Sequence, residues 1–95
     1  MEAHLENIIK NLPKNPGVYR YYDKDTKLLY IGKAKNLKNR VSSYFNNKDH
    51  SFRIQLMVRK IHNIEYSIVD SEKDALLLEN ALIKELQPKY NILLK

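Results

Sequence analysis

Two tripeptides on either side of a polar turn constrain the fold of this chain more than any other feature. Gly-Val-Tyr occupies residues 17–19, and Tyr-Ile-Gly occupies residues 30–32. Between them, Asp-Lys-Asp-Thr at residues 23–26 consists of residue types that close β-turns. The runs on both sides are rich in aromatic and β-branched residues, which favours two antiparallel strands. The sequence therefore predicts a β-hairpin over residues 18–33.

The expected register of this hairpin brings two tyrosines together. A turn over residues 23–26 sets Tyr19 opposite Tyr30. The same register sets Gly17 opposite Gly32. Cross-strand Cβ atoms lie about 5 Å apart, so the two hydroxyls can converge on one ligand atom while the glycines leave the backbone open to close approach. The alternative is an aromatic pair that only stabilises the hairpin.

Hydrophobic periodicity predicts the other elements. Apolar residues recur at helical spacing in four segments and alternate with polar residues in one. The sequence predicts helices over residues 5–12, 36–45, 51–61 and 72–86, a third strand over residues 64–68 and a polar loop over residues 46–50. Asn36 is a residue type that caps helices, and Pro88 is expected to end the last helix. This pattern indicates an α+β (mixed α/β) domain with a small three-stranded sheet flanked by helices.

The composition fits a single small domain over residues 1–95. The chain has no cysteine, and 43% of its residues are hydrophobic, which suffices for one modest core. Its start lacks the features of a signal peptide, and no apolar run approaches the roughly 20 residues that cross a bilayer, so we expect a cytoplasmic protein without a membrane segment. The net charge of +6 is concentrated in the middle third of the chain. This charge favours nucleic acid or an anionic membrane surface as a partner, although many basic domains bind neither.

One carboxylate occupies an apolar helix face. On a helical wheel, Glu79 lies within about 60° of five apolar residues of the last predicted helix, which are Ala75, Leu76, Leu82, Ile83 and Leu86. A buried carboxylate costs several kcal/mol unless it is paired or bound to a metal. Glu79 is therefore either the partner of a Lys or Arg, or a metal ligand or general base.

Two cations are expected beside the same position. Arg40 lies between Leu37 and Tyr44 on the inward side of its helix. An inward guanidinium needs an anion, which is either Glu79 or a phosphate. Lys33 follows the second tripeptide and is expected at the same mouth. Together with the two phenols, this set suits the metal-assisted hydrolysis of a phosphodiester.

Histidine is not the obvious general base of such a site. His4, His50 and His62 lie in a terminal segment, a loop and a helix end, and we expect them on the surface. A tyrosine with an ordinary pKa of about 10 acts as a base only if nearby cations lower that pKa. Lys33 is well placed to do so.

These residues together resemble a known nuclease family. Residues 17–19, residues 30–32, Arg40, Glu79 and Asn91 resemble the GIY-YIG nucleases at their usual spacing, over nearly the whole chain. More narrowly, the chain resembles the N-terminal domains of the UvrC proteins of bacterial excision repair, in the runs at residues 12–19, 30–38, 40–41, 43–45 and 88–91. The run Gly-Lys-Ala-Lys-Asn-Leu within them is far more specific than either tripeptide.

The resemblance implies a metal-dependent DNA endonuclease domain. It implies that the domain cuts damaged double-stranded DNA on the 3′ side of a lesion, after docking on a complex of UvrB with that DNA. UvrB is then contacted through regions outside these 95 residues. The chain is accordingly expected to be one N-terminal domain, residues 1–95, of a longer UvrC-like protein.

The resemblance also implies roles for individual residues. Glu79 is the sole protein ligand of one Mg²⁺ or Mn²⁺ ion, with waters in the other positions. Tyr30 is the general base, assisted by Lys33, and Arg40 stabilises the transition state. The remaining implied site residues are Tyr19 and Tyr44, which hydrogen-bond the water shell or the phosphate, Lys35, Lys38 and Asn36, which contact DNA, and Gly17, Gly32 and Asn91, which shape the site.

Two other functions stay open at this point. A stand-alone or homing GIY-YIG nuclease would cut undamaged DNA at a defined sequence without UvrB. A non-catalytic DNA-binding module would use Glu79 and Arg40 as a buried pair and its lysines only to hold phosphates. Its DNA binding would weaken with salt and would not depend on a divalent metal.

Overall fold

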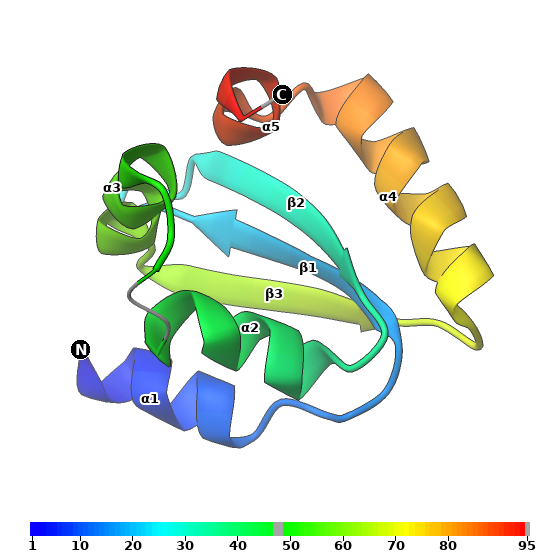
Figure 1. Ribbon diagram of the computed structural model, residues 1–95, viewed down its shortest axis with the longest axis horizontal. Coiled ribbons are helices and arrows are strands. Elements are labelled where there is room, and N and C mark those ends of the chain that lie inside the picture. Colours follow the sequence, from blue (N-terminus) through cyan, green and yellow to red (C-terminus); the bar gives the residue numbers. More distant parts are fainter. Residues whose placement is uncertain (47–48, 95) are drawn as a thin grey trace.

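The structure, a computed structural model, describes residues 1–46 and 49–94. The predicted loop over residues 46–50 therefore lies partly outside the described residues. The elements in chain order are α1 (Ala3–Lys10), β1 (Gly17–Tyr22), β2 (Leu28–Ala34), α2 (Leu37–Asn46), α3 (Phe52–Lys60), β3 (Asn63–Ile68), α4 (Glu72–Leu86) and α5 (Lys89–Leu93). The predicted α+β domain with one three-stranded sheet and flanking helices is confirmed (Figure 1).

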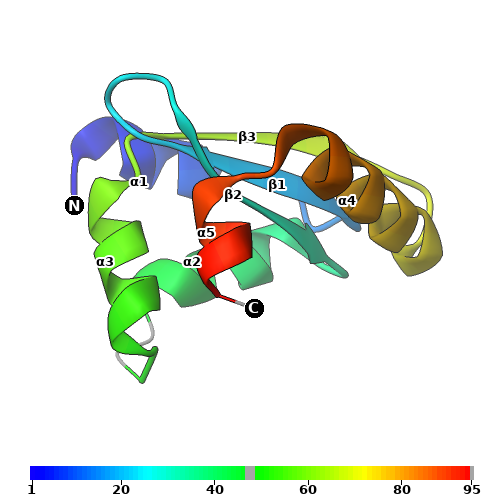
Figure 2. The ribbon, with the colours of Figure 1, turned by 90° about the horizontal axis from the view of Figure 1, so that it is seen from above.

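The sheet separates two groups of helices. Its strand order is β2-β1-β3, and both pairings are antiparallel, so β1 lies in the centre and β2 forms one edge. One face carries the larger core, to which α1, α2, α3 and α5 contribute Leu5, Leu37, Met57 and Tyr90. Seen from above, α2, α3 and α5 lie together on one side of the strands (Figure 2). The helix α4 covers the other face, where its Ala75 packs with Val18 and Ile31.

The hairpin register differs from the prediction by two residues. Tyr19 pairs with Gly32, and Tyr21 pairs with Tyr30. The first of the two extra residues is Lys27, which belongs to the turn, because its carbonyl accepts the amide of Asp23 at 2.9 Å. The second comes from an irregularity in the ladder beside Tyr21. An even shift preserves which side chains share a face, so Tyr19 and Tyr30 remain on the same side of the sheet.

Local capping explains where the later helices begin and end. The Ser51 side chain accepts the amide of Ile54 at the start of α3, and Ser71 accepts that of Asp74 at the start of α4. The helix α4 ends at Leu86, because the next residue adopts the left-handed conformation. The short helix α5 beyond Pro88 was not predicted.

No helix in residues 1–46 and 49–94 combines the length and the apolar character needed to span a membrane.

Candidate active site

A cleft lined by β1, β2, α2 and α4 gathers the side chains predicted to be catalytic. Its volume is about 650 Å³. The residues around it are Tyr19, Tyr30, Gly32, Lys33, Ala34, Lys35, Arg40, Glu72, Lys73, Ala75, Leu76 and Glu79. All five predicted catalytic residues are in this set. The fold therefore brings together groups from the hairpin and from α4, which begins 38 positions after the end of β2.

Packed tyrosine rings form one side of the cleft. The ring centroids of Tyr19 and Tyr30 lie 6.3 Å apart, and those of Tyr30 and Tyr44 are also 6.3 Å apart. The Tyr19 hydroxyl donates a hydrogen bond to the Tyr44 hydroxyl at 3.0 Å. Tyr44 is only 6% exposed and is absent from the lining of the cleft. Tyr44 therefore orients Tyr19 through this hydrogen bond, and its expected contact with the water shell or the phosphate stays a prediction.

The environment of Tyr30 keeps its phenol protonated. Burial raises the pKa of Tyr30, and the neighbouring Tyr44 and the Glu79 carboxylate raise it further, while Arg40 lowers it in part. The half-buried position of the phenol dominates this pKa, and Arg40 is the cation that offsets it in part, while a contribution from Lys33 stays a prediction. To act as a general base, Tyr30 must first lose its proton, and this requires positive charge near the phenol in addition to that of Arg40.

Arg40 lies at the mouth of the cleft as a permanent cation. Its guanidinium carbon lies 5.4 Å from the centroid of the Tyr44 ring, one helical turn further along α2. Burial lowers the pKa of Arg40, but the phenols of Tyr19, Tyr44 and Tyr30 raise it more, so its pKa lies above the ordinary value. Among the described residues no carboxylate forms an ion pair with Arg40, and its charge stays available to an anionic ligand.

Glu79 lies at the border of the cleft and not within a buried stripe. Leu76 and Leu86, which were expected to flank it in the core, are 42% and 47% exposed. The reason is that this part of α4 lies against the edge strand β2, where polar backbone groups replace apolar side chains. The Glu79 Oε2 atom accepts the backbone amide of Lys33 at 2.7 Å. The predicted Glu79–Arg40 pair of the binding-module alternative is not among the ion pairs of the described residues.

The donor chemistry of Glu79 fits a hard divalent cation. The carboxylate is half-buried, one oxygen is fixed by the Lys33 amide, and the side chain faces a cleft with room for water. No Lys, Arg or His of the described residues lies within ion-pair distance of it. Mg²⁺ prefers oxygen ligands and keeps several waters, so a single protein carboxylate suits it.

The two glycines and Asn91 hold the cleft in shape. A Cβ atom at Gly32 would overlap the Tyr19 hydroxyl and ring, and one at Gly17 would overlap the Ser67 carbonyl. The glycines therefore permit close packing within the protein, whereas we expected them to admit a ligand. Asn91 donates from Nδ2 to the Ile31 carbonyl and accepts the Ile31 amide at Oδ1, both at 2.8 Å.

The residues expected to contact DNA are divided between the cleft and the scaffold. Lys35 borders the cleft and lies 3.8 Å from Glu72 in an exposed ion pair. Lys38 lies outside the lining, and its Nζ donates to the Lys10 carbonyl at 3.0 Å, where it satisfies the end of α1. Asn36 accepts the Asn39 amide at 3.0 Å and so caps α2. Periodicity could not reveal the Lys38 contact, because its partner lies 28 residues away.

Sequence reasoning missed two residues next to the site. Lys73, on the first turn of α4, is exposed and borders the cleft. Tyr21 is fully buried, and its ring centroid lies 5.0 Å from that of Tyr19. Strand alternation from Tyr19 could have placed Tyr21 on this face.

Comparison with known proteins identifies the family. A family profile described as the UvrC-like GIY-YIG domain matches residues 15–92. The UvrABC system protein C of Flavobacterium psychrophilum is 62% identical over 93 residues, which cover 98% of this chain and 16% of that protein. The protein of the same name from Neisseria meningitidis is 61% identical over 87 residues, which cover 92% of this chain and 14% of that protein. The chain thus spans about one sixth of the length of these relatives.

A solved structure matches the whole domain. The GIY-YIG N-terminal endonuclease domain of UvrC from Thermotoga maritima, bound to its catalytic divalent cation, magnesium, has a TM-score of 0.83 and 36% identity to this chain. The match covers 95% of this chain and 98% of that one. Four point mutants of that domain, three with tyrosine replaced by phenylalanine and one with asparagine replaced by alanine, are likewise bound to the catalytic divalent cation. This chain therefore belongs to the UvrC-like GIY-YIG domain family.

Proposed function

We propose that this chain is a divalent-metal-dependent DNA endonuclease domain that hydrolyses one phosphodiester bond on the 3′ side of a lesion in nucleotide excision repair. The observation that carries the proposal is the convergence of Tyr30, Arg40 and Glu79 on one basic cleft. Among the described residues, the Arg40 guanidinium has no carboxylate partner and the Glu79 carboxylate has no cationic partner. Both observations favour a site that binds a phosphate and a metal ion, and they argue against a structural ion pair.

Glu79 is the residue that would hold one Mg²⁺ or Mn²⁺ ion. In the Thermotoga domain, replacement of single tyrosines leaves the catalytic cation bound, which supports a carboxylate as the ligand in this chain. The bound ion supplies charge neutralisation at the scissile phosphate. The Lys33 amide holds the Glu79 carboxylate in place through its 2.7 Å hydrogen bond.

The remaining cleft residues handle the proton and the developing charge. Tyr30, once ionised to the phenolate, would take a proton from the attacking water as the new bond to phosphorus forms and the bond to the leaving oxygen breaks, and the leaving oxygen would take a proton from solvent. Arg40 lowers the pKa of Tyr30 in part and stabilises the negative charge that develops on the phosphate. Tyr19, held by Tyr44, hydrogen-bonds the water shell or the phosphate. Lys33 assists Tyr30 as a nearby positive charge.

The substrate is damaged double-stranded DNA presented by UvrB. The names of the full-length relatives, UvrABC system protein C, support this assignment. UvrB is contacted through regions outside these 95 residues, and repair of chromosomal DNA takes place in the bacterial cytoplasm. Lys33 and Lys35 border the cleft and contact the phosphates, which fixes position without reading sequence.

Crystals soaked in Mn²⁺ test the metal site separately from the reaction. An anomalous peak about 2.0 to 2.2 Å from the Glu79 carboxylate is expected in the wild-type protein. The peak should disappear in Glu79→Gln and persist in Glu85→Gln, which removes an exposed carboxylate of the same helix. A peak that survives Glu79→Gln would contradict Glu79 as the ligand.

An incision assay tests the reaction. A labelled duplex with one lesion, loaded with UvrB, is incubated with the chain and Mg²⁺, and the 3′ cut is measured. Glu79→Gln is expected to abolish incision, and Tyr30→Phe to slow it by about 10²- to 10⁴-fold. Wild-type incision by Tyr30→Phe would remove Tyr30 as the base. A wild-type chain that binds duplex DNA, but neither binds a divalent metal nor cuts this substrate or undamaged duplex, would favour the binding module.

A further inference from the structure

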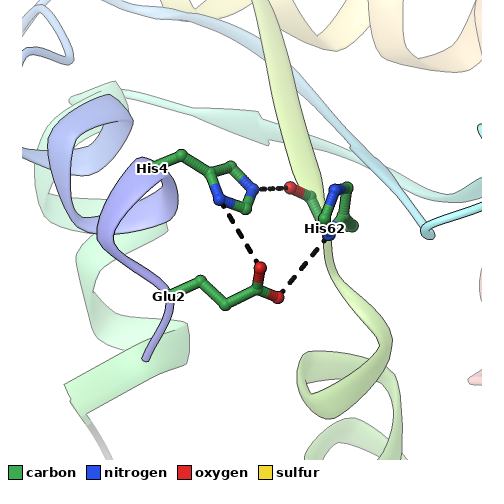
Figure 3. A group of neighbouring side chains, drawn as sticks. All are labelled: Glu2, His4 and His62. Atoms are coloured by element: carbon green, nitrogen blue, oxygen red, sulfur yellow. Dashed lines mark hydrogen bonds and ion pairs between the residues drawn. The ribbon is translucent and has the colours of Figure 1, made fainter.

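Three potential metal ligands meet where α1 joins the start of β3. Glu2 precedes α1, His4 lies on its first turn, and His62 lies just before β3. The Glu2 carboxylate lies 3.6 Å from Nδ1 of His4 and 3.5 Å from Nδ1 of His62. Figure 3 shows both imidazoles facing the carboxylate, each joined to a different one of its two oxygens. These ligand atoms all lie within 4.8 Å of one another.

This cluster is separate from the active-site cleft. None of its three residues lines the cleft. The helix α1 contributes to the core on one face of the sheet, whereas α4 covers the other face. The cluster is open to solvent, because the side chains of Glu2, His4 and His62 are 58%, 44% and 45% exposed.

A hydrogen bond from Nε2 of His4 determines which of its ring nitrogens faces the Glu2 carboxylate. Nε2 of His4 lies 2.6 Å from the His62 carbonyl oxygen. A carbonyl oxygen only accepts, so Nε2 carries the hydrogen and donates it. Nδ1 of His4 is then the ring nitrogen that faces the Glu2 carboxylate, where either a proton or a metal ion can lie between the two. A ring nitrogen that donates to a carbonyl while the other faces a metal is the usual second shell of a ligating histidine.

The three residues offer transition-metal ligands at short range. Each imidazole faces a different oxygen of the Glu2 carboxylate: Nδ1 of His4 lies 3.6 Å from Oε2, and Nδ1 of His62 lies 3.5 Å from Oε1. Zn²⁺ binds histidine nitrogen and carboxylate oxygen at about 2.0 to 2.2 Å, so binding through one carboxylate oxygen requires the ligand atoms, which lie within 4.8 Å of one another, to close to about 3.3 to 3.6 Å. Two imidazoles and one carboxylate suit Zn²⁺, Ni²⁺ or Cu²⁺, whereas Mg²⁺ prefers oxygen ligands alone.

We propose that Glu2, His4 and His62 form a second metal site, for a divalent transition-metal ion with Zn²⁺ as the expected occupant, and with water in the remaining position. The ion connects the N-terminal helix to the α3–β3 junction, 58 residues further along the chain. It serves as a clip on the fold and takes no part in DNA cleavage.

Metal titration tests this site in a Glu79→Gln background, where the cleft cannot contribute. The protein is used without an affinity tag. Calorimetry with Zn²⁺ measures how many ions bind and how tightly. The absorption bands of added Co²⁺ report whether the bound ion is tetrahedral. One ion per chain is expected. Loss of an outer-shell partner alone weakens metal binding about 10- to 100-fold, so removal of a ligand by His4→Gln or His62→Gln should weaken it at least as much. His50→Gln removes the third histidine of the chain and should leave binding unchanged.

Thermal unfolding provides a second measurement. With Zn²⁺ at about 100 times its dissociation constant, the unfolding midpoint of the starting protein is expected to rise by roughly 10 °C. The rise should vanish in His4→Gln and His62→Gln. Equal Zn²⁺ binding in these variants and in His50→Gln, or no saturable binding at all, would overturn the proposal.

Discussion

At the scale of single residues, Tyr21 is the least satisfied group near the active site. Its side chain is fully buried, and its hydroxyl has no hydrogen-bond partner among the described residues. An unsatisfied buried hydroxyl costs about 1 to 3 kcal/mol. We therefore expect Tyr21→Phe to raise the free energy of unfolding in urea by about 1 kcal/mol. Tyr66→Phe, at an exposed position of β3, should change it by less than about 0.5 kcal/mol. A less stable Tyr21→Phe protein would mean that the hydroxyl has a partner such as a buried water.

Buried phenols also make stability depend on pH in alkali. Burial raises the pKa of Tyr19, Tyr21 and Tyr30 above the ordinary value near 10. In the unfolded chain these phenols ionise near pH 10, while the folded protein keeps them neutral. Their contribution to stability is therefore complete below pH 10 and falls as the pH rises above it. Urea unfolding between pH 8 and about 11 should show this fall, and Tyr21→Phe should make it less steep. Identical slopes in both proteins would contradict the assignment.

At the scale of elements, the outer edge of β2 determines how the site is assembled. The backbone groups on this edge lack a neighbouring strand. Side chains from the C-terminal segment occupy it instead: Asn91 bonds both backbone groups of Ile31, and Glu79 accepts the amide of Lys33. Covering an exposed edge in this way prevents pairing with other chains. The same contacts place the proposed metal ligand beside the tyrosines that we propose as catalytic.

Removal of the Asn91 side chain should loosen this arrangement. Asn91→Ala leaves the Ile31 amide and carbonyl without partners, and we expect a loss of about 1 to 3 kcal/mol in unfolding free energy. Hydrogen exchange of the Ile31 amide should accelerate, because α5 no longer protects it. Asn39→Ala, at an exposed site on α2, is the matched control and should leave that amide protected. Unchanged exchange in Asn91→Ala would show that the edge is protected by other means.

Sequence patterns predicted the elements better than their registration. The order of helices and strands follows from periodicity, and the shared face of Tyr19 and Tyr30 follows from strand alternation. The pairing of Tyr19 with Gly32 does not, because it depends on a ladder irregularity and on turn hydrogen bonds that have no periodic signature. For the same reason the bonds of Asn91 to Ile31, which join residues 60 positions apart, became visible only in the structure.

At the scale of the whole molecule, basic side chains surround the cleft, but not all of them are equally free to contact DNA. The chain has a net charge of +6, and a cation that already bonds the protein cannot release counterions from DNA as freely as one that faces solvent. Composition located the basic middle third of the chain. It could not separate Lys35, which borders the cleft, from Lys38, which bonds the end of α1. It also passed over Lys73, which the fold of α4 carries to the cleft from outside that segment.

This distinction predicts how substitutions change the salt dependence of DNA binding. The logarithm of the affinity for duplex DNA should fall linearly with the logarithm of salt concentration, with a slope set by the number of phosphate contacts. Lys35→Ala and Lys73→Ala should each weaken binding and reduce the slope by about 1. Lys38→Ala removes the same formal charge and is the matched control. It should leave the slope unchanged and lower the unfolding free energy by about 0.5 to 1.5 kcal/mol, because the Lys10 carbonyl loses its donor. Equal slope changes in all three variants would show that DNA responds to the overall charge of the domain and not to the cleft.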